Sequence, residues 1–144
     1  MRINQNLAGL ERLRLSSIEI NEVNNDLIDL VVHTKKICPH FHIPLQSGDD
    51  VILKRMNRKY TSSQYVETLN GIRAKMKLPS FTTDVIVGFP GEKDVHFQNT
   101  IDLCEKAGFS RIHLFPYSTR EGTPAAKMTD HCLPQIIRQR KAQL

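Results

Sequence analysis

Residues 81–91, FTTDVIVGFPG, decide the fold that this sequence predicts. The run from Phe81 to Val87 is rich in β-branched residues, which favour strands, and the glycines and proline at 88–91 end it. Asp84 stands in the middle of this otherwise apolar run. An acid inside a strand is costly unless it is paired or solvated by a cavity, so Asp84 is the most informative single residue.

Helical and strand-like segments alternate on both sides of this strand. Strands are expected near 13–18, 41–45 and 111–115, and helices near 24–33, 51–56, 61–76 and 97–107 and from Pro134 onward. Thr61 and Gln64 have the spacing of a capping box, and Gly108 is placed to cap a helix end. Strands that alternate with helices predict a parallel α/β sheet. Because four strands cannot close a barrel, this is an open sheet or a piece of a larger barrel.

Composition narrows the class of protein. The chain has 144 residues, of which 40% are hydrophobic and 24% charged, as in a single globular domain. No apolar run approaches the roughly 20 residues of a membrane span, and no signal-peptide core begins the chain. The three cysteines, Cys38, Cys104 and Cys132, lie far apart, which predicts a reduced, cytoplasmic protein without its own zinc or iron–sulfur site. The net charge of +5 permits a polyanionic partner.

Polar residues follow the predicted strands at the edge where parallel α/β folds carry their sites. Glu19, Gln46 and Asp84 are expected to converge there, and two acids with an amide suit ribose hydroxyls and an amino group. The alternative for Asp84 is a structural acid held by Thr or Arg. His40 and His42 share a strand face, but no third metal ligand is adjacent, so packing or hydrogen bonding is expected. No P-loop or G-x-G-x-x-G occurs, which disfavours nucleotide hydrolysis and hydride transfer.

Four blocks of sequence carry a resemblance to a known family: HIPLQSG at 42–48, LKRMNRKYT at 53–61, TDVIVGFPGE at 83–92 and FPYSTREGTPA at 115–125. They are similar to the radical S-adenosylmethionine (SAM) methylthiotransferases. The resemblance covers about residues 9–128 and matches the later part of the central catalytic domain, which leaves 129–144 as a basic C-terminal helix. The implied fold is a partial TIM-like (β/α) barrel.

Two shorter blocks, RLSSIE at 14–19 and CPHFH at 38–42, most resemble the enzymes that methylthiolate N6-threonylcarbamoyladenosine next to the tRNA anticodon. Sister groups act on isopentenyl-adenosine in tRNA or on an aspartate of a ribosomal protein. A non-enzymatic α/β binding module is the remaining alternative.

The resemblance also implies cofactors and partners. The full-length enzymes use SAM and 4Fe–4S clusters, with the first cluster held by a C-x-x-x-C-x-x-C loop, and their partner is tRNA. This chain has no such loop, no N-terminal cluster domain and no C-terminal RNA domain, so we expect it to bind no cluster and to be inactive alone. The first strand would lack its barrel neighbour, which predicts self-association through the exposed sheet edge.

Site residues follow from the resemblance by position. Those expected to bind SAM are Glu19, Gln46, Arg58 and Asp84, with Ser17 and Ser47 as further candidates. The Arg58 fork suits the methionyl carboxylate, and the acids suit hydroxyl donors. Tyr117 and Arg120 are expected to face substrate or RNA. No catalytic residue and no metal ligand is assigned.

Overall fold

The computed structural model describes residues 9–144 as alternating helices and strands. In chain order the elements are η1 (Ile20–Glu22), α1 (Asn25–His33), β1 (His40–His42), α2 (Asp50–Arg55), α3 (Ser62–Lys75), β2 (Ser80–Val87), α4 (Asp94–Ala107), β3 (Arg111–Pro116), η2 (Pro124–Lys127) and α5 (Pro134–Gln143). None of the described helices is long and apolar enough to cross a membrane.

The three strands form one parallel sheet in the order β1-β2-β3. The central strand β2 aligns Thr82 with His42 on one side and Asp84 with His113 on the other. This confirms the predicted parallel α/β sheet. The order of the strands along the chain matches their order in space, as in a segment of a (β/α) barrel.

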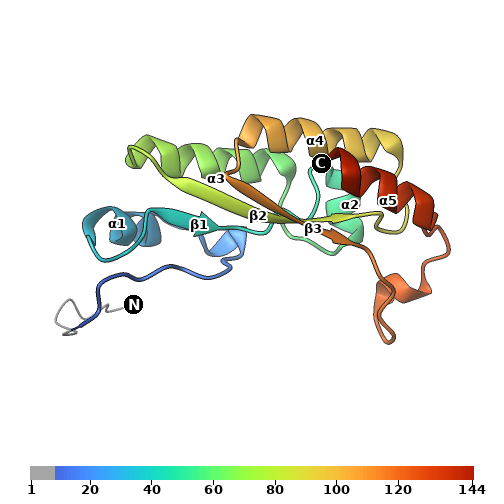
Figure 1. Cartoon of the computed structure of the whole chain (residues 1–144), viewed down its shortest axis with the longest axis horizontal. Coiled ribbons are helices and arrows are strands. Elements are labelled where there is room, and N and C mark those ends of the chain that lie inside the picture. The colour runs from blue at the N-terminus through green and yellow to red at the C-terminus, as the bar shows by residue number, and fades with distance from the viewer. Residues whose placement is uncertain (1–8) are drawn as a thin grey trace.

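Helices cover one face of the sheet, where α3, α4 and α5 lie side by side over β2 and β3 (Figure 1). Side chains alternate along β2, so Phe81, Thr83, Val85 and Val87 are buried beneath these helices while Thr82, Asp84 and Ile86 point the other way. The buried set packs against the apolar residues of α3 and α4. We call the opposite side the open face.

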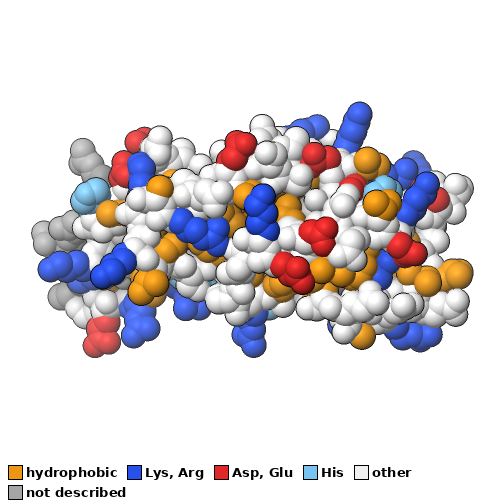
Figure 2. Space-filling view, turned by 90° about the horizontal axis from the view of Figure 1, so that it is seen from above, with side chains coloured by type: hydrophobic (Ala, Val, Ile, Leu, Met, Phe, Trp, Pro, Cys, Tyr) orange, Lys and Arg blue, Asp and Glu red, His pale blue; other side chains and the backbone are white. Residues whose placement is uncertain are grey.

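The helix-covered side is a mixed polar surface. Lys and Arg side chains are interspersed there with Asp and Glu (Figure 2). This arrangement is typical of solvated helix faces, which is the ordinary explanation for the basic clusters around α2 and α3.

The predicted strand at 13–18 is not continuous in the structure. The segment runs parallel to the neighbouring chain but makes two isolated bridges, Leu13 with Ile37 and Ser17 with His42. It lies at the sheet edge on the side away from the helices (Figure 1). The two bridges are four residues apart on this segment and five apart on its neighbour, so the register shifts between them and no continuous ladder forms. Self-association through this edge stays a prediction.

The predicted helix ends are confirmed. Asn24 caps α1 by accepting a hydrogen bond from Leu27 N–H, and the capping box of Thr61 and Gln64 starts α3. Gly108 ends α4 with a φ of 58°, the left-handed conformation that glycine adopts without strain. Gly108 therefore ends α4 three residues before β3 begins at Arg111.

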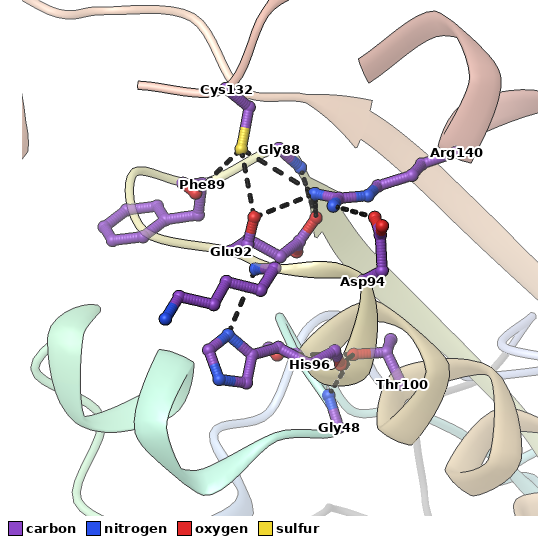
Figure 3. Close-up of polar contacts among 11 residues, drawn as sticks. Gly48, Gly88, Phe89, Glu92, Asp94, His96, Thr100, Cys132 and Arg140 are labelled. Carbon is purple, nitrogen blue, oxygen red and sulfur yellow. Dashed lines mark hydrogen bonds and ion pairs between the residues drawn. The ribbon is translucent and has the colours of Figure 1, made fainter. Parts of the chain in front are cut away.

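The last helix is attached by a buried ion pair. The Arg140 guanidinium donates to the Glu92 carboxylate at 2.7 Å and to Asp94 at 2.7 Å, next to the Cys132 thiol (Figure 3). Glu92 also accepts from Gly88 N–H at the end of β2. The network joins α5 to the turn that follows β2.

Candidate functional site

Two hollows lie on the open face of the sheet. The carboxyl-end hollow, about 420 Å³, is lined by Gln46, Asp84, Ile86, Phe89, Phe115, Pro116, Tyr117, Ser118, Arg120, Thr123 and Ala125. The amino-end hollow, about 470 Å³, is lined by Arg14, Leu15, Ser16, Ser17, His40, His42, Thr82, Asp84, Arg111, His113 and Phe115. Asp84 and Phe115 line both, so the central acid stands between them.

Gln46 is held in an uncommon backbone conformation. Its φ is 64°, which a side chain other than glycine rarely adopts. Two hydrogen bonds to β2 hold it there: Gln46 N–H donates to Asp84 O at 2.8 Å, and Ile86 N–H donates to Gln46 O at 2.9 Å. Strained residues that the surroundings hold in place cluster at functional sites. The amide therefore lines the hollow beside Asp84, as expected from the sequence.

Asp84 is flanked by two imidazoles. Its Oδ2 lies 3.2 Å from His42 Nε2, and its Oδ1 lies 3.2 Å from His113 Nδ1. His42 Nδ1 and His40 Nε2 both contact the Thr82 hydroxyl, at 2.8 and 3.0 Å. The acid is thus paired, but by histidines rather than by the Thr or Arg that a purely structural role predicts, and it still borders both hollows.

Glu19 and Arg58 pair with each other. Arg58 Nη1 donates to Glu19 Oε1 at 2.9 Å, and neither side chain lines the two hollows. The pair adjoins Tyr60, whose pKa is raised to about 12 by burial, lowered in part by Arg58 and raised further by Glu19. The Tyr60 hydroxyl donates to Leu45 O at 2.9 Å, directly before Gln46. The expected convergence of Glu19 with Gln46 and Asp84 in one hollow is therefore not found, because Glu19 pairs with Arg58 instead.

The four weaker candidates divide between surface and core. Ser17 lines the amino-end hollow, and Tyr117 and Arg120 line the carboxyl-end hollow. The Tyr117 hydroxyl is buried without a hydrogen-bond partner in the described part of the chain, and its ring meets Phe89 edge-on at 5.3 Å. Ser47 is 1% exposed, accepts a hydrogen bond from Asp49 N–H and lies 3.4 Å from the Thr100 hydroxyl, away from both hollows.

Sequence reasoning missed His113 and Arg111 as site residues. Both follow the alternation of β3 onto the open face with Phe115, while Ile112 and Leu114 point inward. The period of two along 111–115 was a usable signal, since it places His113 on one face with Arg111. The residue of β2 that lies opposite His113 depends on the register between the two strands. The local pattern of β3 does not determine that register.

Comparisons with known proteins identify the family of the chain. The model of the Radical SAM superfamily matches residues 4–104. The tRNA-2-methylthio-N(6)-dimethylallyladenosine synthase of Corynebacterium diphtheriae is 44% identical over 138 residues, which is 96% of this chain and 27% of that protein. The threonylcarbamoyladenosine tRNA methylthiotransferase MtaB of Rickettsia prowazekii is 46% identical over 135 residues, or 94% of this chain and 32% of that protein.

A solved structure has the same fold. The coproporphyrinogen III oxidase HemN of Escherichia coli, described as a radical SAM enzyme, superposes with a TM-score of 0.75 and 18% identity, covering 92% of this chain and 30% of that one. The chain therefore spans about a third or less of the proteins that it matches. At this identity the likeness to HemN concerns the fold alone.

Proposed function

The chain belongs to the radical SAM superfamily, and from this premise we propose that it is part of a tRNA methylthiotransferase that adds a methylthio group to N6-threonylcarbamoyladenosine next to the anticodon. The observation that carries the proposal is the 46% identity, over 94% of this chain, with a threonylcarbamoyladenosine tRNA methylthiotransferase. The 44% identity with dimethylallyladenosine enzymes supports the second candidate, the dimethylallyl (isopentenyl) nucleoside. Both candidates are methylthiolations of an adenosine in tRNA.

Membership of the superfamily implies SAM and a 4Fe–4S cluster as cofactors. The polar groups of the carboxyl-end hollow fit the adenosyl part of SAM. The Asp84 carboxylate and the Gln46 amide suit ribose hydroxyls and an amino group, and Ile86 and Phe89 offer apolar walls for a base. Glu19 and Arg58 remain proposed SAM contacts from outside this hollow, and Ser17 remains one from the amino-end hollow. Ser47 is buried against α4, so its expected contact with SAM is not supported by its position. When bound with the cluster, SAM supplies the radical chemistry of the superfamily.

The residues present do not fit the cluster. Cys104 is buried in the core, and Cys38 and Cys132 lie half-buried elsewhere. Among residues 9–144, no cysteine belongs to a group of three or more His, Cys, Asp or Glu side chains placed to hold a metal. We therefore expect that incubation with iron and sulfide leaves the chain without a stoichiometric cluster. The measurement is iron content with absorbance in the charge-transfer region, and a full complement of iron and sulfide would contradict the expectation.

Removing the Asp84 or Gln46 side chain is expected to weaken SAM binding. Loss of a hydrogen bond to a charged group such as Asp84 costs about 1.5–3 kcal/mol, which corresponds to roughly 10- to 100-fold in Kd. Loss of a bond to the neutral Gln46 amide costs about 0.5–1.5 kcal/mol, or roughly 2- to 10-fold. The measurement is calorimetric titration of SAM into the 144-residue chain and into Asp84→Ala and Gln46→Ala.

Glu105→Ala and Gln139→Ala are matched controls, because each removes the same type of group from an exposed helix position away from the hollows. They should titrate like the parent. If the Asp84 and Gln46 variants also bind SAM with the parent's affinity, the proposed site is wrong.

A further inference from the structure

The amino-end hollow is lined mainly by basic and hydroxyl side chains, although Asp84 lies within it. Around Asp84 it gathers two guanidinium groups, three imidazoles and three hydroxyls, from Arg14, Arg111, His40, His42, His113, Ser16, Ser17 and Thr82. Asp84 is the one acid among the described residues that line it. We propose that this hollow binds an anionic oxygen group of the substrate, a carboxylate or a phosphate.

The Asp84 charge is already matched by its own partners. Each of its two oxygens faces an imidazole nitrogen at 3.2 Å. The fixed positive charges of Arg14 and Arg111 therefore remain for a ligand, since neither makes an ion pair with Asp84. Guanidinium groups bind carboxylates and phosphates through paired N–H donors, so these two side chains suit an anion with several oxygens.

His40 also lines the hollow, and its protonation bears on the proposal. The side chain is 7% exposed and lines the hollow, with Nε2 placed on the Thr82 hydroxyl at 3.0 Å. Its Nδ1 is buried and has no hydrogen-bond partner in the described part of the chain. Where the Thr82 hydroxyl donates to His42 Nδ1, His40 Nε2–H donates to Thr82, so Nδ1 of the neutral ring is an acceptor. Nδ1 can donate to an anion only when the ring is protonated. Burial, Arg14 and His42, in that order, lower the pKa of His40, and an anion in the hollow would offset the two charge effects.

A bound cation is the competing explanation. One ligand atom each of His42, Asp84 and His113 lie within 4.8 Å of one another, as in a site for a divalent metal. Two observations favour the anion. Arg14 and Arg111 line the same hollow and would repel a cation, and the network is satisfied without one if both imidazoles donate to Asp84 and the Thr82 hydroxyl donates to His42 Nδ1.

The anion has two possible sources in the proposed reaction, and this step rests on the proposed function. The threonylcarbamoyl group named for one relative carries a carboxylate, whereas the dimethylallyl group named for the other is a hydrocarbon. The phosphate backbone of tRNA is the second source. Because both hollows share Asp84 and Phe115, a substrate group in the amino-end hollow would lie next to the hollow proposed for SAM.

The test follows histidine ring signals by NMR in the 144-residue chain at constant ionic strength. The probes are the nucleosides N6-threonylcarbamoyladenosine and N6-dimethylallyladenosine, and inorganic phosphate. We expect the first nucleoside to shift the His40, His42 and His113 signals and to bind about tenfold or more tightly than the second. His33 and His96, which lie outside the hollow, should not move.

Arg111→Gln should weaken binding of the anionic probe by about tenfold, while Arg138→Gln, which removes the same charge from an exposed position on α5, should leave it unchanged. Arg14→Gln is a second variant and should act like Arg111→Gln. If phosphate and the two nucleosides shift the same histidines with affinities that do not distinguish the nucleosides, the site holds and its ligand is the phosphate backbone.

Three results would overturn the inference. The first is that no anion shifts the histidine signals, and the second is that Arg111→Gln and the parent bind the anionic probe equally well. The third is that stoichiometric Zn²⁺ shifts the His42 and His113 signals while no anion does so. None of these affects the titration of SAM into Asp84→Ala and Gln46→Ala. The anion site and the proposed function can therefore fail separately.

Discussion

Arg140→Met is expected to lower the free energy of unfolding by about 3–5 kcal/mol, because it leaves the Glu92 carboxylate buried without its ion-pair partner. The two side chains are 6% and 2% exposed, and Arg140 Nη1 lies 2.7 Å from Glu92 Oε1. The same guanidinium donates to Glu92 O and to Asp94, so two contacts of α5 with the turn after β2 and one with the start of α4 disappear together. Urea denaturation of both chains measures the difference.

The effect should depend on pH. Burial is the main cause that raises the pKa of Glu92, and Gly88 N–H and Arg140 lower it in part. Without Arg140 the pKa of this carboxyl rises further, so more of Glu92 is protonated in the folded variant as the pH falls. A neutral carboxyl carries no buried charge. The destabilisation by Arg140→Met should therefore be larger at neutral pH and smaller at acidic pH near the raised pKa.

Two further variants separate the ion pair from side-chain packing. Arg138→Met changes the same residue type at an exposed position of α5 and should alter the free energy of unfolding by about 0.5 kcal/mol or less. The double variant Arg140→Met with Glu92→Gln removes both charges and should recover part of the loss, because replacing a buried pair costs less than breaking one. A loss of under about 1 kcal/mol in Arg140→Met would show that the pair does not hold α5.

Local signals explain why much of the fold could be predicted. The β-branched run of β2, the capping box of Thr61 and the placement of Gly108 act within a few residues, and each appears where the sequence indicates. Gln46 and Asp84 reach one hollow because both positions are set by strand ends and by the alternation of β2. These features need no knowledge of distant contacts.

Contacts between distant segments explain the rest. The Asp84–His113 contact requires the register of β2 with β3, 29 residues apart. The pairing of Arg58 with Glu19 joins positions 39 residues apart and draws both away from the hollow where the sequence places Glu19. The segment at 13–18 has the alternation of a strand, but it forms a regular strand only if neighbouring segments pair with it continuously. Its own alternation does not show which segments those are.

Gly48 shows how such a distant contact also holds the site in place. It follows Gln46 by two residues, and its N–H donates to the Thr100 hydroxyl of α4 at 3.0 Å. A Cβ at this position would lie 2.6 Å from Thr100 Cα and 2.9 Å from Asn99 O. Both atoms belong to the backbone of α4, so no side-chain rotation relieves the overlap. The glycine therefore permits the close approach of the segment after β1 to the helix.

Gly48→Ala is expected to lower the free energy of unfolding by about 2–3 kcal/mol, the range of an overpacked core, and to weaken SAM binding as the backbone beside Gln46 moves. Gly71→Ala is the matched control. Gly71 lies inside α3 with nothing within 4 Å of an added Cβ, so the same change should raise the free energy of unfolding by about 0.5–1 kcal/mol. Urea denaturation of both variants, with SAM titration of each, tests the opposite signs. If Gly48→Ala is as stable as the parent and binds SAM equally well, close packing on α4 does not position Gln46.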